Sequence, residues 1–313
     1  MAMAKFIQFL DKYFGVFLIT GLIMGLINPF YSSILMPMLK PFLMVTLFLV
    51  FLKTDVALVF QKMKNYRQVI FFTFIYMIAI PVLFFLAIQP FNRELAVGIL
   101  LLTAMPAGTA SPALTDIAKG NTALSTSIVI ITSVIAPVTV PLLFWGLMIG
   151  DLSVNSWFIF RDLALLIFLP MAASQLIKRY FPGIIIKSSH LFTSINVLLL
   201  AVMVYAIIGS QRDTILNNPV KILWQTGLLY IVFILLHLIG FFMGYKEDRK
   251  GKIATAIGAA YMNNAMAIVL AAIYFSPSIL VLMVLSEIPW NTMLVPFRKI
   301  MNTSIFPRNF SNR

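Results

Sequence analysis

The sequence contains no cysteine and only two histidines, His190 and His237, among its 313 residues. The lack of cysteine excludes disulfide bonds, thiolate metal sites and a cysteine nucleophile. The two histidines lie far apart and lack the spacing of paired metal ligands, and we find no paired carboxylates and no set of a nucleophile and a base. The sequence therefore predicts neither an enzyme nor an organic cofactor.

Charged residues are also scarce. They make up 11% of the chain, whereas a soluble domain of this size needs about a quarter, and hydrophobic residues make up 61%. Apolar runs recur along the whole chain, each long enough to cross about 30 Å of hydrocarbon as a helix rising about 1.5 Å per residue. These features predict an all-α membrane protein without a separate soluble domain.

Apolar windows between charged residues and Pro or Gly breaks predict ten membrane spans. They are residues 14–29, 32–51, 68–88, 95–118, 121–148, 157–177, 190–208, 223–243, 253–274 and 278–297. Five spans fall within residues 1–150 and five within 151–300, followed by a tail from 301 to 313. Because five is an odd number, the second half enters the membrane from the opposite side, as in the inverted repeats of transporters.

Basic residues outnumber acidic ones, with 23 Lys and Arg against 10 Asp and Glu. The net charge of +13 does not indicate nucleic-acid binding, because the basic residues lie in short loops between apolar runs. If the N-terminus is cytoplasmic, 18 of the 23 basic residues lie on the cytoplasmic side. The positive-inside rule therefore predicts a multi-pass protein of the cytoplasmic (inner) membrane with both termini in the cytoplasm. We expect a monomer.

Two spans are interrupted at matching places in the two halves. The segment "MPAGTASPALTD", residues 105–116, brings Pro106, Gly108 and Pro112 into the fourth span, and proline cannot continue a regular helix. Polar residues interrupt the ninth span at residues 261–264. Unpaired backbone groups are tolerated in a membrane only where they line a cavity, so we expect two broken helices that meet near the midplane. Such helix ends suit an anionic or polar solute, and the absence of a P-loop favours a secondary transporter.

Three stretches resemble the bile acid:sodium symporter family, with this chain as a prokaryotic member. They are "LDKYFGVFLITGLIMGLINP" (10–29), "PAGTASPALTDIAKGNTALSTS" (106–127) and "YMNNAMA" (261–267), and the resemblance runs from about residue 10 to 297. It implies a panel domain of spans 1, 2, 6 and 7 and a core domain of spans 3–5 and 8–10, in which broken helices 4 and 9 cross. It also implies that an organic anion binds between panel and core, that sodium binds behind the crossing, and that relative movement of the domains gives alternating access.

Carried over by position, the resemblance implies two sets of site residues. The substrate-binding set is Thr109, Ser111, Asn264 and Asn291. The residues at sodium-ligand positions are Ser111, Ser125 and Asn263. Where the family has a sodium carboxylate, however, this sequence has Ala259, and Pro112, Val129 and Tyr76 replace neutral residues of the family pattern. The sequence therefore leaves the coupling ion open between sodium and a proton.

Glu287 lies in the middle of the tenth span, where an ionised carboxylate is costly unless it is paired, bound to a cation or protonated. We hypothesise that Glu287 takes up a proton or a cation during transport.

Together these features predict a secondary active transporter of a small organic anion that works by alternating access and is coupled to sodium or protons. Two other functions stay open. One is a passive facilitator or channel with Asn263, Asn264 and Glu287 along its pore, and the other is a non-transporting sensor on the same fold.

Overall fold

The computed structural model describes residues 14–53, 66–147 and 156–301, and every regular element in these ranges is helical. Six helical segments there are long and apolar enough to cross a membrane: 32–53, 69–88, 122–146, 157–180, 219–243 and 277–301. Residues 194–210 and 264–274 form shorter apolar helices. The prediction of an all-α membrane protein is confirmed, whereas the ten-span inverted repeat stays a prediction.

The chain folds into two compact units, residues 1–56 with 162–220 and residues 57–161 with 221–313. Each unit draws on both halves of the sequence, so the units do not follow the predicted repeat boundary at residue 150. That boundary and residues 302–313 of the predicted tail lie outside the described residues. Apart from the start of the sixth span, the first unit contains the segments that the resemblance assigns to the panel, and the second contains those of the core.

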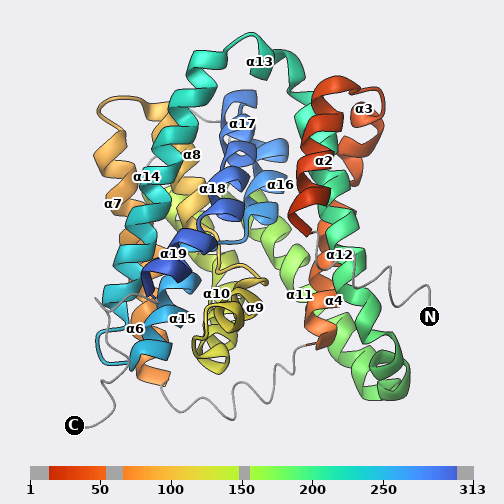
Figure 1. Cartoon of the computed structure of the whole chain (residues 1–313), viewed down its shortest axis with the longest axis vertical. Coiled ribbons are helices and arrows are strands. Elements are labelled where there is room, and N and C mark those ends of the chain that lie inside the picture. The colour runs from red at the N-terminus through yellow and green to blue at the C-terminus, as the bar shows by residue number, and fades with distance from the viewer. Residues whose placement is uncertain (1–13, 54–65, 148–155, 302–313) are drawn as a thin grey trace. The chain divides into compact units, whose positions relative to one another are not determined.

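The first unit is built around a close helix pair. Its elements are α2 (Phe14–Ile27), α3 (Ser32–Leu35), η1 (Met36–Met38), α4 (Leu39–Lys53), most of α11 (Ser156–Tyr180), α12 (Pro182–Ser210) and α13 (Arg212–Leu216). Helices α2 and α12 lie side by side (Figure 1). A Cβ atom at Gly21 would lie 2.5 Å from the carbonyl oxygen of Ala201, and one at Gly25 would lie 2.8 Å from that of Tyr205. Glycines four residues apart therefore let the two backbones touch, as small residues do between membrane helices.

An ion pair links α4 to α11 within this unit. The Nζ atom of Lys40 lies 2.8 Å from Oδ1 of Asp162, whose side chain is only 5% exposed. Lys40 belongs to segment 32–53, which is long and apolar enough to cross a membrane. The sequence-based interpretation missed this pair, because its two members are far apart in the chain.

The second unit contains the broken helices. Its elements are α6 (Tyr66–Phe74), the π-helical turn η2 (Ile75–Ala79), α7 (Ile80–Ile88), α8 (Arg93–Ala104), α9 (Ser111–Ile117), α10 (Thr122–Gly146), α14 (Pro219–Met243, from Lys221 onward), α15 (Arg249–Ala260), α16 (Asn264–Tyr274), α17 (Pro277–Leu285), α18 (Glu287–Thr292) and α19 (Leu294–Met301). The π-helical turn precedes Pro81, which cannot donate the hydrogen bond of a regular helix, and the N–H of Ile80 bonds to the carbonyl of Ile75 instead.

The last predicted span, 278–297, is segmented rather than one regular helix. Helix α17 ends before Ser286 and α18 ends before Met293. A proline ring clashes with the carbonyl four residues earlier, which here belongs to Leu285 for Pro289 and to Thr292 for Pro296. Each of the two helices therefore ends at the residue whose carbonyl would clash with the proline ring four positions later.

Candidate functional site

The two broken helices of the second unit cross at their breaks. The break between α8 and α9 spans residues 105–110, and the break between α15 and α16 spans residues 261–263. Ala107 and Met262 form an antiparallel β-bridge. Around it, the N–H of Gly108 donates to the carbonyl of Tyr261 at 2.7 Å, and the N–H of Asn263 donates to the carbonyl of Pro106 at 2.8 Å. Each break therefore supplies hydrogen-bond partners to the other, which meets the need to satisfy backbone groups inside a membrane.

Neighbouring helices brace this crossing through side chains. The hydroxyl of Tyr76 in η2 donates to the carbonyl of Met105 at 2.8 Å. The hydroxyl of Thr132 in α10 accepts from the N–H of Ala107 at 3.1 Å. The indole N–H of Trp290 in α18 donates to the carbonyl of Met262 at 3.2 Å. Main-chain groups on both breaks are thus held from three directions.

Gly108 allows the two breaks to approach closely. A Cβ atom at this position would lie 2.8 Å from the carbonyl oxygen of Tyr261 and 2.9 Å from that of Met262. Any side chain here would separate the two segments.

Three of the predicted site residues come together beside the second break. Asn264 is the first residue of α16 and is buried, and its Nδ2 donates to the hydroxyl of Ser286 at 2.9 Å. The side chain of Asn291 donates to the carbonyl of Glu287 at 2.7 Å and to its Oε2 at 3.2 Å. The amide of Asn264 also lies within reach of the half-buried Glu287 carboxyl. Asn264, Glu287 and Asn291 therefore form one polar cluster.

The orientation of the Asn264 amide follows from its neighbours. The hydroxyl of Ser286 donates to the carbonyl of Met283 at 2.6 Å, so its oxygen accepts from Nδ2 of Asn264. The Oδ1 atom of Asn264 is then an acceptor, buried and without a hydrogen-bond partner in the described part of the chain. Because nearly all buried polar atoms in proteins are hydrogen-bonded, this oxygen is suited to receive a donor or a cation.

The other two predicted substrate residues belong to the first break. Thr109 is half-buried within it. Ser111 begins α9, is fully buried and donates its hydroxyl to the carbonyl of Tyr261 at 3.1 Å. Ser111 therefore helps to hold the two breaks together, and its oxygen keeps the capacity to accept.

The residues at predicted sodium-ligand positions all have protein partners. Ser125 on α10 accepts from the hydroxyl of Thr115 at 3.1 Å, and both side chains are fully buried. Asn263 caps α16, where its Oδ1 accepts from the N–H of Met266 at 3.1 Å. A carbonyl or hydroxyl oxygen that accepts one hydrogen bond retains a further lone pair. These oxygens therefore stay compatible with a cation.

Close packing surrounds Ala259, the position at which the resemblance implies a carboxylate. Ala259 is fully buried, and a Cβ atom built on Gly240 of α14 would lie only 2.7 Å from the Cβ of Ala259. A long acidic side chain at residue 259 would have to push α14 away. Among the described residues, no group of three or more His, Cys, Asp or Glu side chains could hold a metal ion.

Sequence reasoning missed Ser286, Trp290 and Thr132, which position the crossing and its polar cluster. Ser286 did carry a signal, because it is a polar residue directly before Glu287 in an otherwise apolar segment. His237 packs its ring against Tyr261, and its Nδ1 is 2.8 Å from the carbonyl of Phe233.

A family model described as "Sodium Bile acid symporter family" matches residues 40–218, more than half of the chain. The chain belongs to this family. The sodium bile acid symporter family consists of multi-pass membrane transporters, so the predictions of a membrane transporter family and of no enzyme are confirmed.

Individual relatives agree with the family match. The chain is 31% identical over 191 residues to the "Uncharacterized sodium-dependent transporter YocS" of Bacillus subtilis (strain 168), covering 59% of this chain and 57% of the relative. It is 28% identical over 186 residues to the "Probable sodium/metabolite cotransporter BASS1, chloroplastic" of Arabidopsis thaliana, covering 58% of this chain and 45% of the relative. It is 28% identical over 248 residues to the "Probable sodium/metabolite cotransporter BASS2, chloroplastic" of Oryza sativa subsp. japonica, covering 77% of this chain and 57% of the relative. The chain spans about half the length of the curated relatives it matches.

Proposed function

We propose that the chain is a secondary active transporter of a small organic anion, coupled to a cation and working by alternating access. The observation that carries this proposal is the crossing of two broken helices, with the polar cluster of Asn264, Glu287 and Asn291 beside it. The chain would act as a monomer in the cytoplasmic membrane with both termini in the cytoplasm. Two inverted five-span repeats would supply one broken helix each.

The anionic group of the solute would meet the N-terminus of α16, an 11-residue helix that begins at Asn264. A helix N-terminus carries a partial positive charge, which favours anions. Thr109, Ser111 and Asn291 would supply hydrogen bonds. Because Oδ1 of Asn264 is an acceptor, it would bind a hydroxyl or N–H group of the solute rather than its carboxylate.

Glu287 would carry the coupling cation. Its carboxyl lies beside the amides of Asn264 and Asn291. All other side chains of the predicted span 278–297 are apolar or neutral. An intramembrane carboxylate needs a positive partner or a proton, so it favours cation uptake. The relatives are named as sodium-dependent or sodium/metabolite cotransporters, which favours sodium over a proton. Ser111, Ser125 and Asn263 would provide neutral oxygens for sodium.

The substrate would be identified by a thermal-shift screen of organic acids on purified protein, repeated with sodium, with potassium and across pH. A ligand that binds the native state raises the apparent stability, and its dependence on the ion reports coupling. The best acid is then used for uptake into proteoliposomes under a sodium or a pH gradient.

The decisive variant is Glu287→Gln. We expect it to lose gradient-driven uptake and to lose the dependence on sodium or pH, with normal expression. Asp213→Asn, a change at an exposed carboxylate of the first unit, serves as the control. Unchanged uptake and unchanged ion dependence in Glu287→Gln would refute the coupling role. Unitary currents without accumulation would indicate a passive channel, and tight binding without flux would indicate a sensor.

A further inference from the structure

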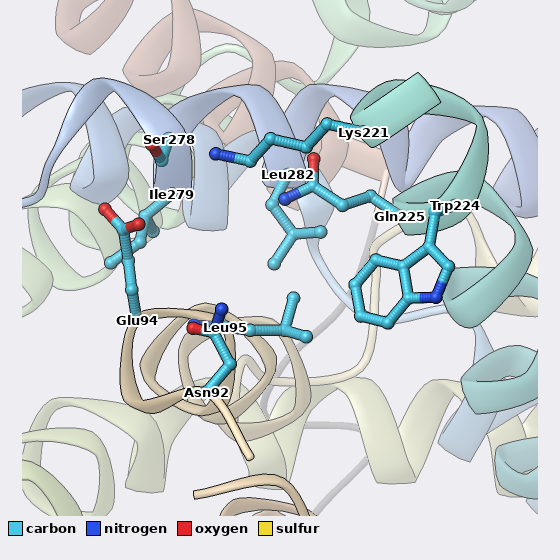
Figure 2. A pocket seen from close by; sticks show the side chains of 9 residues that line it. All are labelled: Asn92, Glu94, Leu95, Lys221, Trp224, Gln225, Ser278, Ile279 and Leu282. Atoms are coloured by element: carbon cyan, nitrogen blue, oxygen red, sulfur yellow. The ribbon is translucent and has the colours of Figure 1, made fainter. Parts of the chain in front are cut away.

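A pocket lies in the second unit, at the N-terminal ends of α8, α14 and α17. It has a volume of about 250 Å³ and shares no residue with the crossing or its polar cluster. Its polar lining includes Glu94, Lys221 and Gln225, and its apolar wall includes Leu95, Trp224 and Leu282 (Figure 2). Nothing in the proposed transport cycle uses these side chains.

Groups of opposite charge face this pocket without neutralising each other. In the part of the chain that the structure describes, neither Lys221 nor Glu94 has an oppositely charged side chain within 4.0 Å, so the two form no ion pair. The carboxylate of Glu94 accepts a hydrogen bond from the hydroxyl of Ser276. In Figure 2, Lys221 and Gln225 extend over the pocket from α14, and Glu94 stands at its other side. The pocket therefore has a cationic and an anionic side.

Gln225 supplies an observation that is independent of charge. Its side chain is only 6% exposed, and its amide makes no hydrogen bond with the described residues. Because this amide lines the pocket beside Lys221, its donor and acceptor atoms are available to a ligand there.

The pocket lies beside the N-terminal turns of three helices. Glu94 and Leu95 lie in the first turn of α8, Lys221 lies in the first turn of α14, and the pocket also contacts the first turns of α17. The ends of α8 and α17 lie on the side of Glu94, and the end of α14 lies on the side of Lys221. The ammonium of Lys221 and the partial positive charge of the α14 N-terminus favour an anionic group, while the carboxylate of Glu94 favours a positive one.

We propose that this pocket binds a small zwitterion, an α-amino acid with an apolar side chain. Its carboxylate would bind Lys221 and the amide of Gln225, its ammonium group would bind Glu94, and its side chain would pack on Trp224 and Leu282. The pocket volume of about 250 Å³ corresponds to about eight water molecules at about 30 Å³ each. A ligand with about that many non-hydrogen atoms, such as leucine, therefore matches the pocket in size.

The test uses purified full-length protein in lipid nanodiscs and three probes measured by calorimetry. The probes are L-leucine, its carboxylate half 4-methylpentanoate, and its amine half 3-methylbutylamine. Leucine should bind at least about tenfold more tightly than either half, because only leucine meets both charges. Lys221→Met should lower the affinity for leucine and for 4-methylpentanoate by about tenfold and leave the affinity for the amine unchanged. Glu94→Gln should lower the affinity for leucine and for the amine and leave the affinity for the acid unchanged.

A matched control is Lys250→Met, which removes an exposed lysine from the first turn of α15, outside the pocket. The melting temperature of each variant without ligand shows that it is folded. Several results would overturn the proposal: no leucine binding by the wild-type protein, equal weakening by Lys250→Met, or full binding by the Lys221→Met/Glu94→Gln double variant. Loss of leucine binding in Glu287→Gln would indicate that leucine binds at the crossing and not in this pocket, which would also overturn the proposal.

Discussion

The hydroxyl of Tyr76 donates a hydrogen bond of 2.8 Å to the main-chain carbonyl of Met105, the residue at which α8 stops being helical. Tyr76 belongs to the π-helical turn η2 and is fully buried. An irregular turn in one helix thus supplies the donor that an interruption in another helix needs. A glutamine is expected at this position from the family resemblance, and the tyrosine serves the architecture of the break instead.

Tyr76→Phe should destabilise the protein by about 1 to 3 kcal/mol, because it leaves the buried carbonyl of Met105 without its donor. The change removes one oxygen and keeps the ring that stacks on Phe72. Thermal unfolding in detergent measures the effect. Tyr245→Phe, at an exposed tyrosine of the same unit, is the control and should melt like the wild-type protein. Equal melting temperatures for both variants would contradict the proposed bracing.

Gly240→Ala should destabilise the second unit by about 1 to 3 kcal/mol through overpacking. The added methyl would lie 2.7 Å from both the Cβ of Ala259 and the carbonyl oxygen of Thr255. Gly227→Ala is a matched control in the same helix, because a Cβ there meets nothing within 4 Å. It should be neutral or slightly stabilising, since alanine favours a helix over glycine. Similar melting temperatures for the two variants would show that α14 and α15 are not in close contact.

Lys40→Met should lower the stability of the first unit by about 1 to 3 kcal/mol, because Asp162 loses its cationic partner while it stays buried. The loss should be smaller than for a fully buried pair, since the side chain of Lys40 is 32% exposed. Asp213→Asn breaks an exposed pair with Arg212 in the same unit and should change stability by less than about 1 kcal/mol. Chemical denaturation monitored by fluorescence compares the two. Equal losses of stability in the two variants would mean that the ion pair of Lys40 and Asp162 is solvated.

Asn264→Leu should lower solute uptake by at least about tenfold, because it removes the acceptor oxygen proposed to meet the solute. Ser286→Ala removes the oxygen that orients the Asn264 amide and should weaken apparent affinity more than maximal rate. Asn217→Leu, at an exposed asparagine, controls for the loss of an amide elsewhere. Initial uptake rates over a range of solute concentrations separate these effects. Wild-type uptake in Asn264→Leu would remove this residue from the binding site.

Features with a local cause could be predicted from the sequence. Pro106 and Gly108 cannot continue a helix, and both helix breaks lie where polar and proline residues enter apolar spans. The segmentation after Leu285 and Thr292 was equally predictable, since Pro289 and Pro296 act on the carbonyls four residues before them.

Features that depend on tertiary contacts could not be predicted in this way. The partners of Tyr76, Lys40 and Asn264 lie in other helices, and no local pattern reveals which helices meet. The tight contact at Ala259 likewise depends on a glycine in another helix. Sequence reasoning therefore found Asn264 and Glu287 as polar residues in apolar spans, but it did not find what orients them.

The helix pair α2 and α12 constrains how this chain can evolve. A side chain at Gly21 or Gly25 would strike main-chain carbonyls of α12, which every residue type carries. No second-site suppressor on α12 could make room by shortening a side chain. Gly98 differs, because its neighbour is a methyl group of Leu282, which a smaller residue would remove. Genetic selection should therefore recover compensating changes for a substitution at Gly98, but none within α12 for one at Gly21.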